Sequence, residues 1–198
     1  TGHNRENARE AFRLFSEAGY VIDGGRLVHK ETRAPLGFEI LAGSSVQQRL
    51  IASYVSDLAK LGIAARLRVV DSSQYQSRLK DYDYDMIQTA WPSSLSPGNE
   101  QVFRWDSRNA DVPGSFNFVG VKNPAVDAMI NRLLEAEGDE DFTSAVRALD
   151  RVLLSGHYVI PLFHASRQWV ANWKQVQGPK TFSLWGYNLD TWWIDGQK

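Results

Sequence analysis

Apolar residues recur at the spacing of a helix within residues 6–18, three and four positions apart. Gly19 follows at the position where a helix commonly ends. Apolar residues then flank the polar turn sequence at residues 23–26, which contains two consecutive glycines. The pattern therefore predicts a helix followed by a short hairpin over residues 20–28.

The next segment has the pattern of a β-α-β unit. Residues 36–41 and 63–70 are rich in apolar and β-branched side chains, and each predicts a strand. Between them, a helix is predicted from the capping pair Ser44 and Ser45 to Leu61, with one apolar stripe. The loop after this helix is short, so we expect the two strands to be parallel neighbours.

The second half mixes clear and weak patterns. The pattern predicts a helix over residues 73–80 and a strand over 84–91. In residues 92–120, frequent Pro, Gly, Asn and Ser predict a long loop. Long loops in compact domains often carry functional residues. Further elements are expected in order: helices over 124–136 and 140–154, strands over 158–163 and 168–173, and a tail over 175–198 without a clean period. These elements predict an α/β fold.

Composition narrows the function classes. The chain has 198 residues, 43% apolar and 23% charged, which suits one globular domain or a domain with an appendage. A net charge of −1 provides no basic surface for nucleic acid or anionic lipid. The absence of Cys excludes a disulfide framework, a thiolate metal site and a Cys nucleophile.

The pattern contains no export or membrane signal. No apolar run approaches the roughly 20 residues that span a bilayer. Residues 1–9 are polar and differ from a signal peptide. On this evidence the chain is either cytosolic or has lost the segment that directs export.

Candidate chemistry is sparse. There is no dinucleotide, P-loop or Gly-x-Ser-x-Gly motif, and the four His are scattered. Asp81, Asp83 and Asp85 alternate along a predicted strand, so they would share a face as a cation or acid–base cluster. A polar strand entrance facing water is the favoured interpretation. Five of the seven Trp follow residue 165, and burial against another surface is favoured over stacking on sugars or bases.

Six short motifs occur in order within residues 8–173. They are the helix end at 11–20, the Gly62-Ile63 step, Tyr84-Asp85-Met86 with Trp91, and segments 123–127, 148–153 and 158–162. This series resembles family 5 extracellular solute-binding proteins, which serve peptide- and nickel-type ABC importers. Residues 91–101 and 190–193 also resemble the oligopeptide and microcin C branch of that family.

The resemblance implies one lobe of a periplasmic binding protein type II fold, a mixed sheet flanked by helices. It implies that residues 1–173 form a C-terminal ligand-binding lobe, and that residues 174–198 return to an N-terminal lobe outside this chain. The implied role is the periplasmic substrate-binding component of an ABC importer, which captures peptide-like solutes and delivers them to membrane permease subunits. It implies no enzyme activity, and no cofactor, metal or nucleic-acid partner is expected.

The resemblance also implies a ligand site at the end of the strand that leads to Trp91. Backbone groups of residues 90–93 would pair with the main chain of the ligand, as in strand addition. Relatives often place an Asp, which holds the ligand ammonium, at the position of Ser94. Either Glu100 takes that role, or the ligand has no free amino terminus there. The full candidate set is Tyr75, Gln88, Ala90, Trp91, Pro92, Ser93, Ser94, Asn99, Glu100 and Asn117.

Two other functions remain open from the residues alone. A hydrolase could use Asp83, Asp85 and Glu100, although the sequence supplies no assembled nucleophile, base and orienting group. A carbohydrate-binding module could use the late Trp residues. Three of these, Trp185, Trp192 and Trp193, are expected to make an ordered contact, within the chain or with a neighbouring copy.

Overall fold

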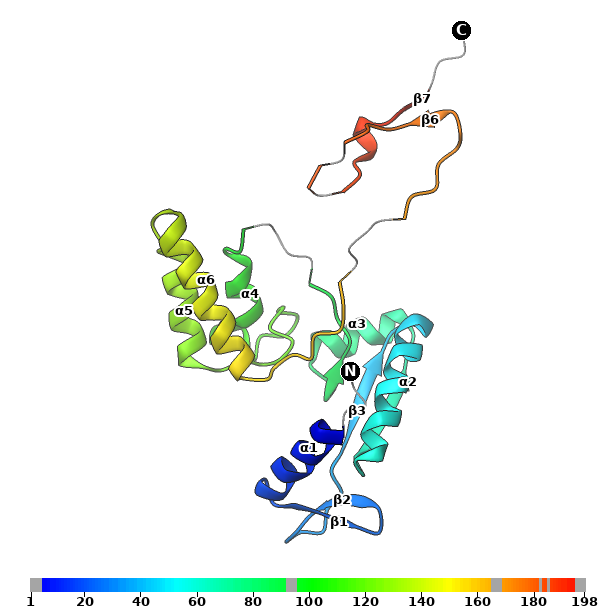
Figure 1. The fold of residues 1–198 in the computed structure, drawn as a ribbon, viewed down its shortest axis with the longest axis vertical. Helices are drawn as coiled ribbons and strands as arrows, with labels where there is room; N and C mark the ends of the chain where they lie inside the picture. The colour runs from blue at the N-terminus through cyan, green and yellow to red at the C-terminus, as the bar shows by residue number, and fades with distance from the viewer. Residues whose placement is uncertain (1–4, 92–95, 165–168, 182, 185, 195–198) are drawn as a thin grey trace. The chain divides into compact units, whose positions relative to one another are not determined.

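The computed structural model describes residues 5–91, 96–164, 169–181, 183–184 and 186–194 (Figure 1). The chain divides into two compact units, Thr1–Tyr158 and Val159–Lys198, which are considered separately. Within the described residues, no helix is long and apolar enough to cross a membrane.

The first unit starts with a helix and a hairpin, as predicted. Helix α1 spans Arg5–Glu17, and the antiparallel strands β1 (Tyr20–Asp23) and β2 (Arg26–His29) follow. Both glycines of the intervening turn have positive φ angles, which side chains other than Gly rarely adopt. Leu27 of β2 is almost fully buried and packs in a small core with Leu58 and Ile63.

A three-stranded parallel sheet is the centre of this unit. Its strands are β3 (Gly37–Ala42), β4 (Ala64–Val69) and β5 (Met86–Ile87), in the order β4-β3-β5. Helix α2 (Ser45–Lys60) connects β3 to β4, and the Ser44 hydroxyl accepts a hydrogen bond from the Gln47 backbone N–H at its start. The parallel pairing of β3 and β4 confirms the predicted β-α-β unit.

The strand leading to Trp91 is shorter than its pattern predicts. Helix α3 (Ser72–Lys80) precedes it, and Asp71 caps that helix by accepting from two backbone N–H groups. After Ile87, the carbonyl of Gln88 accepts hydrogen bonds from the Gln47 amide and the Tyr75 hydroxyl. Because these two side chains hydrogen-bond the Gln88 carbonyl, it needs no partner on a neighbouring strand, and the pairing of β5 with β3 ends at Ile87.

The predicted loop over residues 92–120 contains helical structure. Helix α4 (Glu100–Trp105) and a 3₁₀ turn, η1 (Ser107–Asn109), interrupt it. Helices α5 (Pro124–Leu134) and α6 (Gly138–Ser155) follow as predicted. Their apolar faces bury a second core that also includes Trp105 and Val121. Helix α4 is therefore anchored to a helical layer through Trp105.

The second unit differs from its predicted pattern. The described residues at 158–164 and 169–173 form no strand, so both strands predicted there are wrong. No described strand pairs with these segments, and an isolated strand is not stable in water. Instead β6 (Val176–Gln177) pairs with β7 (Trp193–Ile194), after a 3₁₀ turn η2 (Leu189–Thr191).

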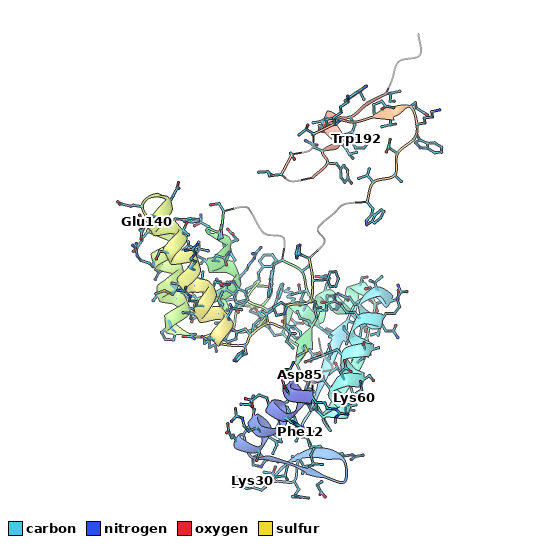
Figure 2. The ribbon with its side chains drawn as sticks, in the orientation of Figure 1. Phe12, Lys30, Lys60, Asp85, Glu140 and Trp192 are labelled. Atoms are coloured by element: carbon cyan, nitrogen blue, oxygen red, sulfur yellow. The ribbon has the colours of Figure 1, made fainter. Side chains whose placement is uncertain are left out.

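One tryptophan organises this second unit. The ring of Trp192, labelled in Figure 2, lies against Gly178. A Cβ added at Gly178 would approach this ring to 2.8 Å. Tyr187 packs edge-on against the same ring, with centroids 6.3 Å apart. The backbone of Trp193 pairs with that of Gln177, while the residue is 51% exposed, so the expected contact of its ring within the chain or with a neighbouring copy stays a prediction. Trp185 lies outside the described residues.

Candidate functional site

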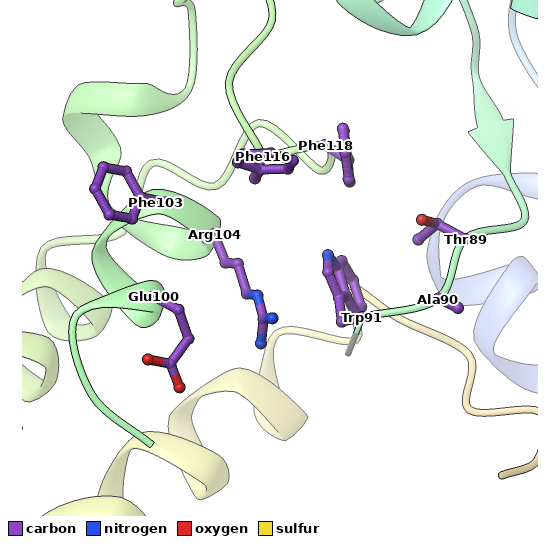
Figure 3. A pocket seen from close by; sticks show the side chains of 8 residues that line it. All are labelled: Thr89, Ala90, Trp91, Glu100, Phe103, Arg104, Phe116 and Phe118. Carbon is purple, nitrogen blue, oxygen red and sulfur yellow. The ribbon is translucent and has the colours of Figure 1, made fainter. Parts of the chain in front are cut away.

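A pocket of about 340 Å³ opens beside Trp91 in the first unit (Figure 3). Three segments form it: the chain after β5, helix α4, and the loop that precedes α5. Its lining residues are Thr89, Ala90, Trp91, Glu100, Phe103, Arg104, Phe116 and Phe118. The walls are mainly aromatic, as is common for sites that bind small organic ligands.

Trp91 connects the segment after β5 to helix α4, because its ring contacts Trp105 of that helix. Its ring packs against that of Trp105, with centroids 5.2 Å apart and planes inclined by 55°. Its indole nitrogen is buried and has no hydrogen-bond partner among the described residues. Figure 3 shows this nitrogen end of the ring turned toward Phe116 and Phe118. An indole N–H can only donate, so this nitrogen is a buried donor without an acceptor among the described residues.

Helix α4 supplies one acidic and one basic side chain to the pocket. Glu100 begins the helix and accepts a hydrogen bond from the backbone N–H of Gly98 at 3.1 Å. Arg104 lies four residues later, one turn along the same face. The two opposite charges sit next to the aromatic wall (Figure 3).

Two tyrosines hold the loop that carries Phe116 and Phe118. The Tyr82 hydroxyl donates to the carbonyl of Val112 at 3.0 Å, and the Tyr84 hydroxyl donates to that of Phe118 at 2.9 Å. Burial raises the pKa of Tyr84 to about 12, so its hydroxyl keeps its proton and remains a donor at physiological pH. The loop is thus tied to the segment that enters β5.

Asn117 lies between the two phenylalanines, yet it faces the interior. It is fully buried, and its amide nitrogen donates to the carbonyls of Asp106 and Val121, each at 3.1 Å. Its amide oxygen accepts from the Val121 N–H at 2.9 Å. All of these contacts are made within the protein, so Asn117 shapes the loop from behind the pocket.

Tyr75 and Gln88 lie behind the strand end. The Tyr75 hydroxyl donates to the Gln88 carbonyl at 3.1 Å, and burial raises the pKa of this tyrosine. The side-chain oxygen of Gln88 is buried without a hydrogen-bond partner among the described residues. Tyr75 therefore supports the strand end, while Gln88 retains an unused acceptor.

The family is established by sequence comparison. The sequence model described as "Bacterial extracellular solute-binding proteins, family 5 Middle" matches residues 1–111, more than half of the chain. The chain belongs to this family. It therefore shares ancestry with solute-binding proteins.

Two of the most similar proteins define the family relationship further. A putative binding protein of Brucella suis is 50% identical over 197 residues, which cover 100% of this chain and 32% of that protein. The peptidoglycan-binding protein YepA of Agrobacterium fabrum is 45% identical, over 98% of this chain and 31% of its own length. The chain thus spans about a third of the length of these relatives.

A solved structure confirms the fold expected of the family. The oligopeptide-binding protein AppA of Bacillus subtilis, in complex with a nonapeptide, matches 94% of this chain and 37% of its own, with a TM-score of 0.72. At 17% identity the likeness concerns the fold alone. The α/β lobe of a periplasmic binding protein, predicted from the motif series, is confirmed.

The pocket brings together part of the candidate set of this family 5 chain. Ala90, Trp91 and Glu100 line it. Tyr75, Gln88 and Asn117 lie around it with the internal contacts described above, while Asn99 occupies the first position before α4 and makes no side-chain cap. Pro92, Ser93 and Ser94 lie outside the described residues. The binding role of the whole set stays a prediction.

Five pocket residues were absent from that set: Thr89, Phe103, Arg104, Phe116 and Phe118. Two signals could have found some of them. Val102 and Trp105 are three positions apart, as on one helix face, and Glu100 and Arg104 are four apart. Phe116 and Phe118 alternate with Asn117, which places two aromatic side chains on one side of an extended segment.

The cation or acid–base cluster that the sequence left open at Asp81, Asp83 and Asp85 does not form, and all three residues are exposed, as in the favoured interpretation of a polar segment facing water. Asp83 pairs with Arg78 at 2.8 Å, and Asp85 accepts from the backbone N–H of Glu39, also at 2.8 Å. Residues 81–83 follow helix α3 in a turn rather than a strand, so their side chains do not share a face. Among the described residues, no three His, Asp or Glu side chains converge to hold a metal ion.

A glycine makes room for Tyr75, and its replacement should destabilise the strand end. A Cβ added at Gly43 would lie 2.8 Å from the Tyr75 ring. Overpacking of this kind destabilises by about 1–3 kcal/mol, so we expect Gly43→Ala to lower the midpoint of denaturant unfolding. Gly98→Ala is the control, because the nearest atom to its added Cβ is 3.6 Å away. Equal stability of the two variants would contradict the packing role of Gly43.

Proposed function

We propose that this chain is the C-terminal ligand-binding lobe of the substrate-binding component of an ABC importer. The component captures peptide-like solutes and delivers them to permease subunits in the membrane. The observation that carries this proposal is the aromatic pocket with an unpartnered donor at the end of β5, in a family 5 chain. A peptidoglycan-binding relative and a structural neighbour holding a nonapeptide support a peptide-like ligand.

The backbone beside the pocket is suited to main-chain recognition. Thr89 and Ala90 are exposed, and their backbone groups make no hydrogen bond to another described residue. An extended, unpaired segment that continues a strand can pair with the main chain of a peptide. Such pairing gives affinity without depending on the side chains of the ligand. On this basis we propose that Ala90 and Trp91 lie at the ligand, while the same role for residues 92–94 rests on the family resemblance alone.

The other lobe would supply the opposite face of the ligand. The relatives are about three times as long as this chain, which leaves ample sequence for an N-terminal lobe. In the second unit Trp169 is 98% exposed and Trp173 is 78% exposed. Apolar surface of this kind marks a contact site. We assign residues 174–198, together with these exposed rings, to contact with that lobe, and the protein to the periplasm.

This assignment predicts that the isolated chain binds peptides weakly. A cleft that closes between two lobes gives its full affinity only when both contact the ligand. We expect calorimetry to detect peptide binding by the full-length protein and little or none by residues 1–198 alone. Micromolar peptide binding by the isolated chain would contradict the two-lobed site.

The alternative functions find less support. A hydrolase based on Asp83 and Asp85 would need side chains that are engaged in internal hydrogen bonds. A carbohydrate-binding module would use exposed Trp rings such as Trp169 and Trp173, which the two-lobed arrangement assigns to a protein contact. Calorimetric titration of the full-length protein with peptides and with oligosaccharides distinguishes the peptide-binding proposal from the carbohydrate-binding alternative. We expect the protein to bind peptides and not to bind plain oligosaccharides.

A further inference from the structure

The pocket wall offers aromatic surface that the protein itself leaves uncovered. Phe103 is 58% exposed and Phe116 is 59% exposed, and both rings line the pocket. Phe116 packs edge-on against Phe118, with centroids 5.9 Å apart, which holds its ring in place. Covering this exposed aromatic surface with an apolar group of the ligand is favourable, because it removes apolar area from water.

The charges at the pocket oppose each other. Glu100 and Arg104 contribute one carboxylate and one guanidinium to the lining. Their combined formal charge is zero, so the lining as a whole favours neither an ammonium nor a carboxylate group of the ligand. Moving either charged group from water to the aromatic walls is unfavourable. The pocket is therefore suited to an uncharged group.

The indole N–H of Trp91 sets a second requirement. Its nitrogen is buried and has no partner among the described residues. A buried donor without an acceptor is destabilising. The nitrogen has less than 1 Å² of exposed area, so a ligand oxygen reaches it once the neighbouring side chains move aside, and the new hydrogen bond then removes that penalty. Because an N–H can only donate, the ligand atom has to be an acceptor such as a carbonyl oxygen.

The pocket is large enough for a ligand that presents both an uncharged side chain and a hydrogen-bond acceptor. Its volume is about 340 Å³. This lies at the lower end of the range of roughly 300–1,000 Å³ that is typical of ligand pockets in proteins. That is room for one large side chain together with the peptide group beside it.

On the basis of the proposed function, we propose that this pocket selects an uncharged aromatic or aliphatic side chain of the bound peptide. Trp91 Nε1 donates a hydrogen bond to a main-chain carbonyl oxygen beside that side chain. The walls recognise the side chain, while the indole N–H recognises the backbone of the ligand. Side-chain preference and overall affinity thus depend on different residues of one pocket.

The test uses the full-length protein and calorimetry with alanine pentapeptides, in which each position in turn carries Phe, Lys or Glu. At one position we expect Phe to raise the affinity about tenfold or more, as burial of a large apolar side chain does. Lys and Glu should lower the affinity at the same position. Phe116→Ala should remove the preference for Phe, while Phe12→Ala, on helix α1 and outside the pocket, should leave it intact.

Trp91→Phe tests the hydrogen bond separately, because it keeps an aromatic ring and removes the donor. We expect this variant to bind every pentapeptide about three- to tenfold more weakly and to keep the preference for Phe. A flat ranking at all five positions, or unchanged affinity in Trp91→Phe, overturns this inference alone. Failure of the wild-type protein to bind any peptide overturns the proposed function and this inference with it.

Discussion

Replacing Trp91 by Ala in the full-length protein should weaken ligand binding by about 1–3 kcal/mol, the size of effect seen for aromatic residues at the centre of an interface. The ring lines the pocket and rests on Trp105, so its loss removes a wall and the indole donor together. Calorimetry or fluorescence titration with a bound peptide measures the change.

The matched control is Asp81→Ala. Asp81 is exposed in the turn after helix α3 and does not line the pocket. An exposed carboxylate contributes little, so we expect an affinity close to that of the wild-type protein. Equal losses in the two variants would refute the assignment of Trp91 to the ligand site.

Replacing Asn117 by Ala should destabilise the lobe by roughly 3 kcal/mol or more, because several buried polar groups lose their partners together. The side chain satisfies two carbonyls and one N–H in a region closed to water. Without it, the loop that carries Phe116 and Phe118 loses its internal support. Chemical unfolding monitored by fluorescence measures the effect.

Asn131→Ala provides the comparison, since this asparagine is exposed on helix α5. We expect a change in the free energy of unfolding within about 0.5 kcal/mol for this variant. The outcome also separates two roles for Asn117. A variant of unchanged stability with lost ligand affinity would favour direct binding by Asn117 over the scaffolding role.

The sequence predicts those parts of the fold whose signals are local. Helices α2, α5 and α6 each carry a sustained apolar stripe, and their bounds agree with the pattern within a few residues. Helix α4 is six residues long and lies among Pro and Gly, so its period is too short to stand out. The end of β5 depends on two side chains, from Gln47 and Tyr75, that are distant in sequence.

The residues of the candidate site likewise divide into those that the sequence predicts and those that only the folded structure brings together. Trp91 and Glu100 follow from the resemblance because they lie within its motifs, and Ala90 follows because it directly precedes Trp91. Phe116 and Phe118 reach the pocket through a loop held by Tyr84, a contact between residues 34 positions apart in the chain. No local pattern encodes such a contact, so the second aromatic wall could be found only from the folded structure.

Mass spectrometry of the material that co-purifies with the full-length protein tests the central proposal most directly. We expect peptide-like molecules in near-stoichiometric amount with the wild-type protein, and much less of them with Trp91→Ala purified in parallel. Retention of the same molecules by both proteins, or recovery of a ligand without peptide bonds, would contradict a peptide site at this pocket.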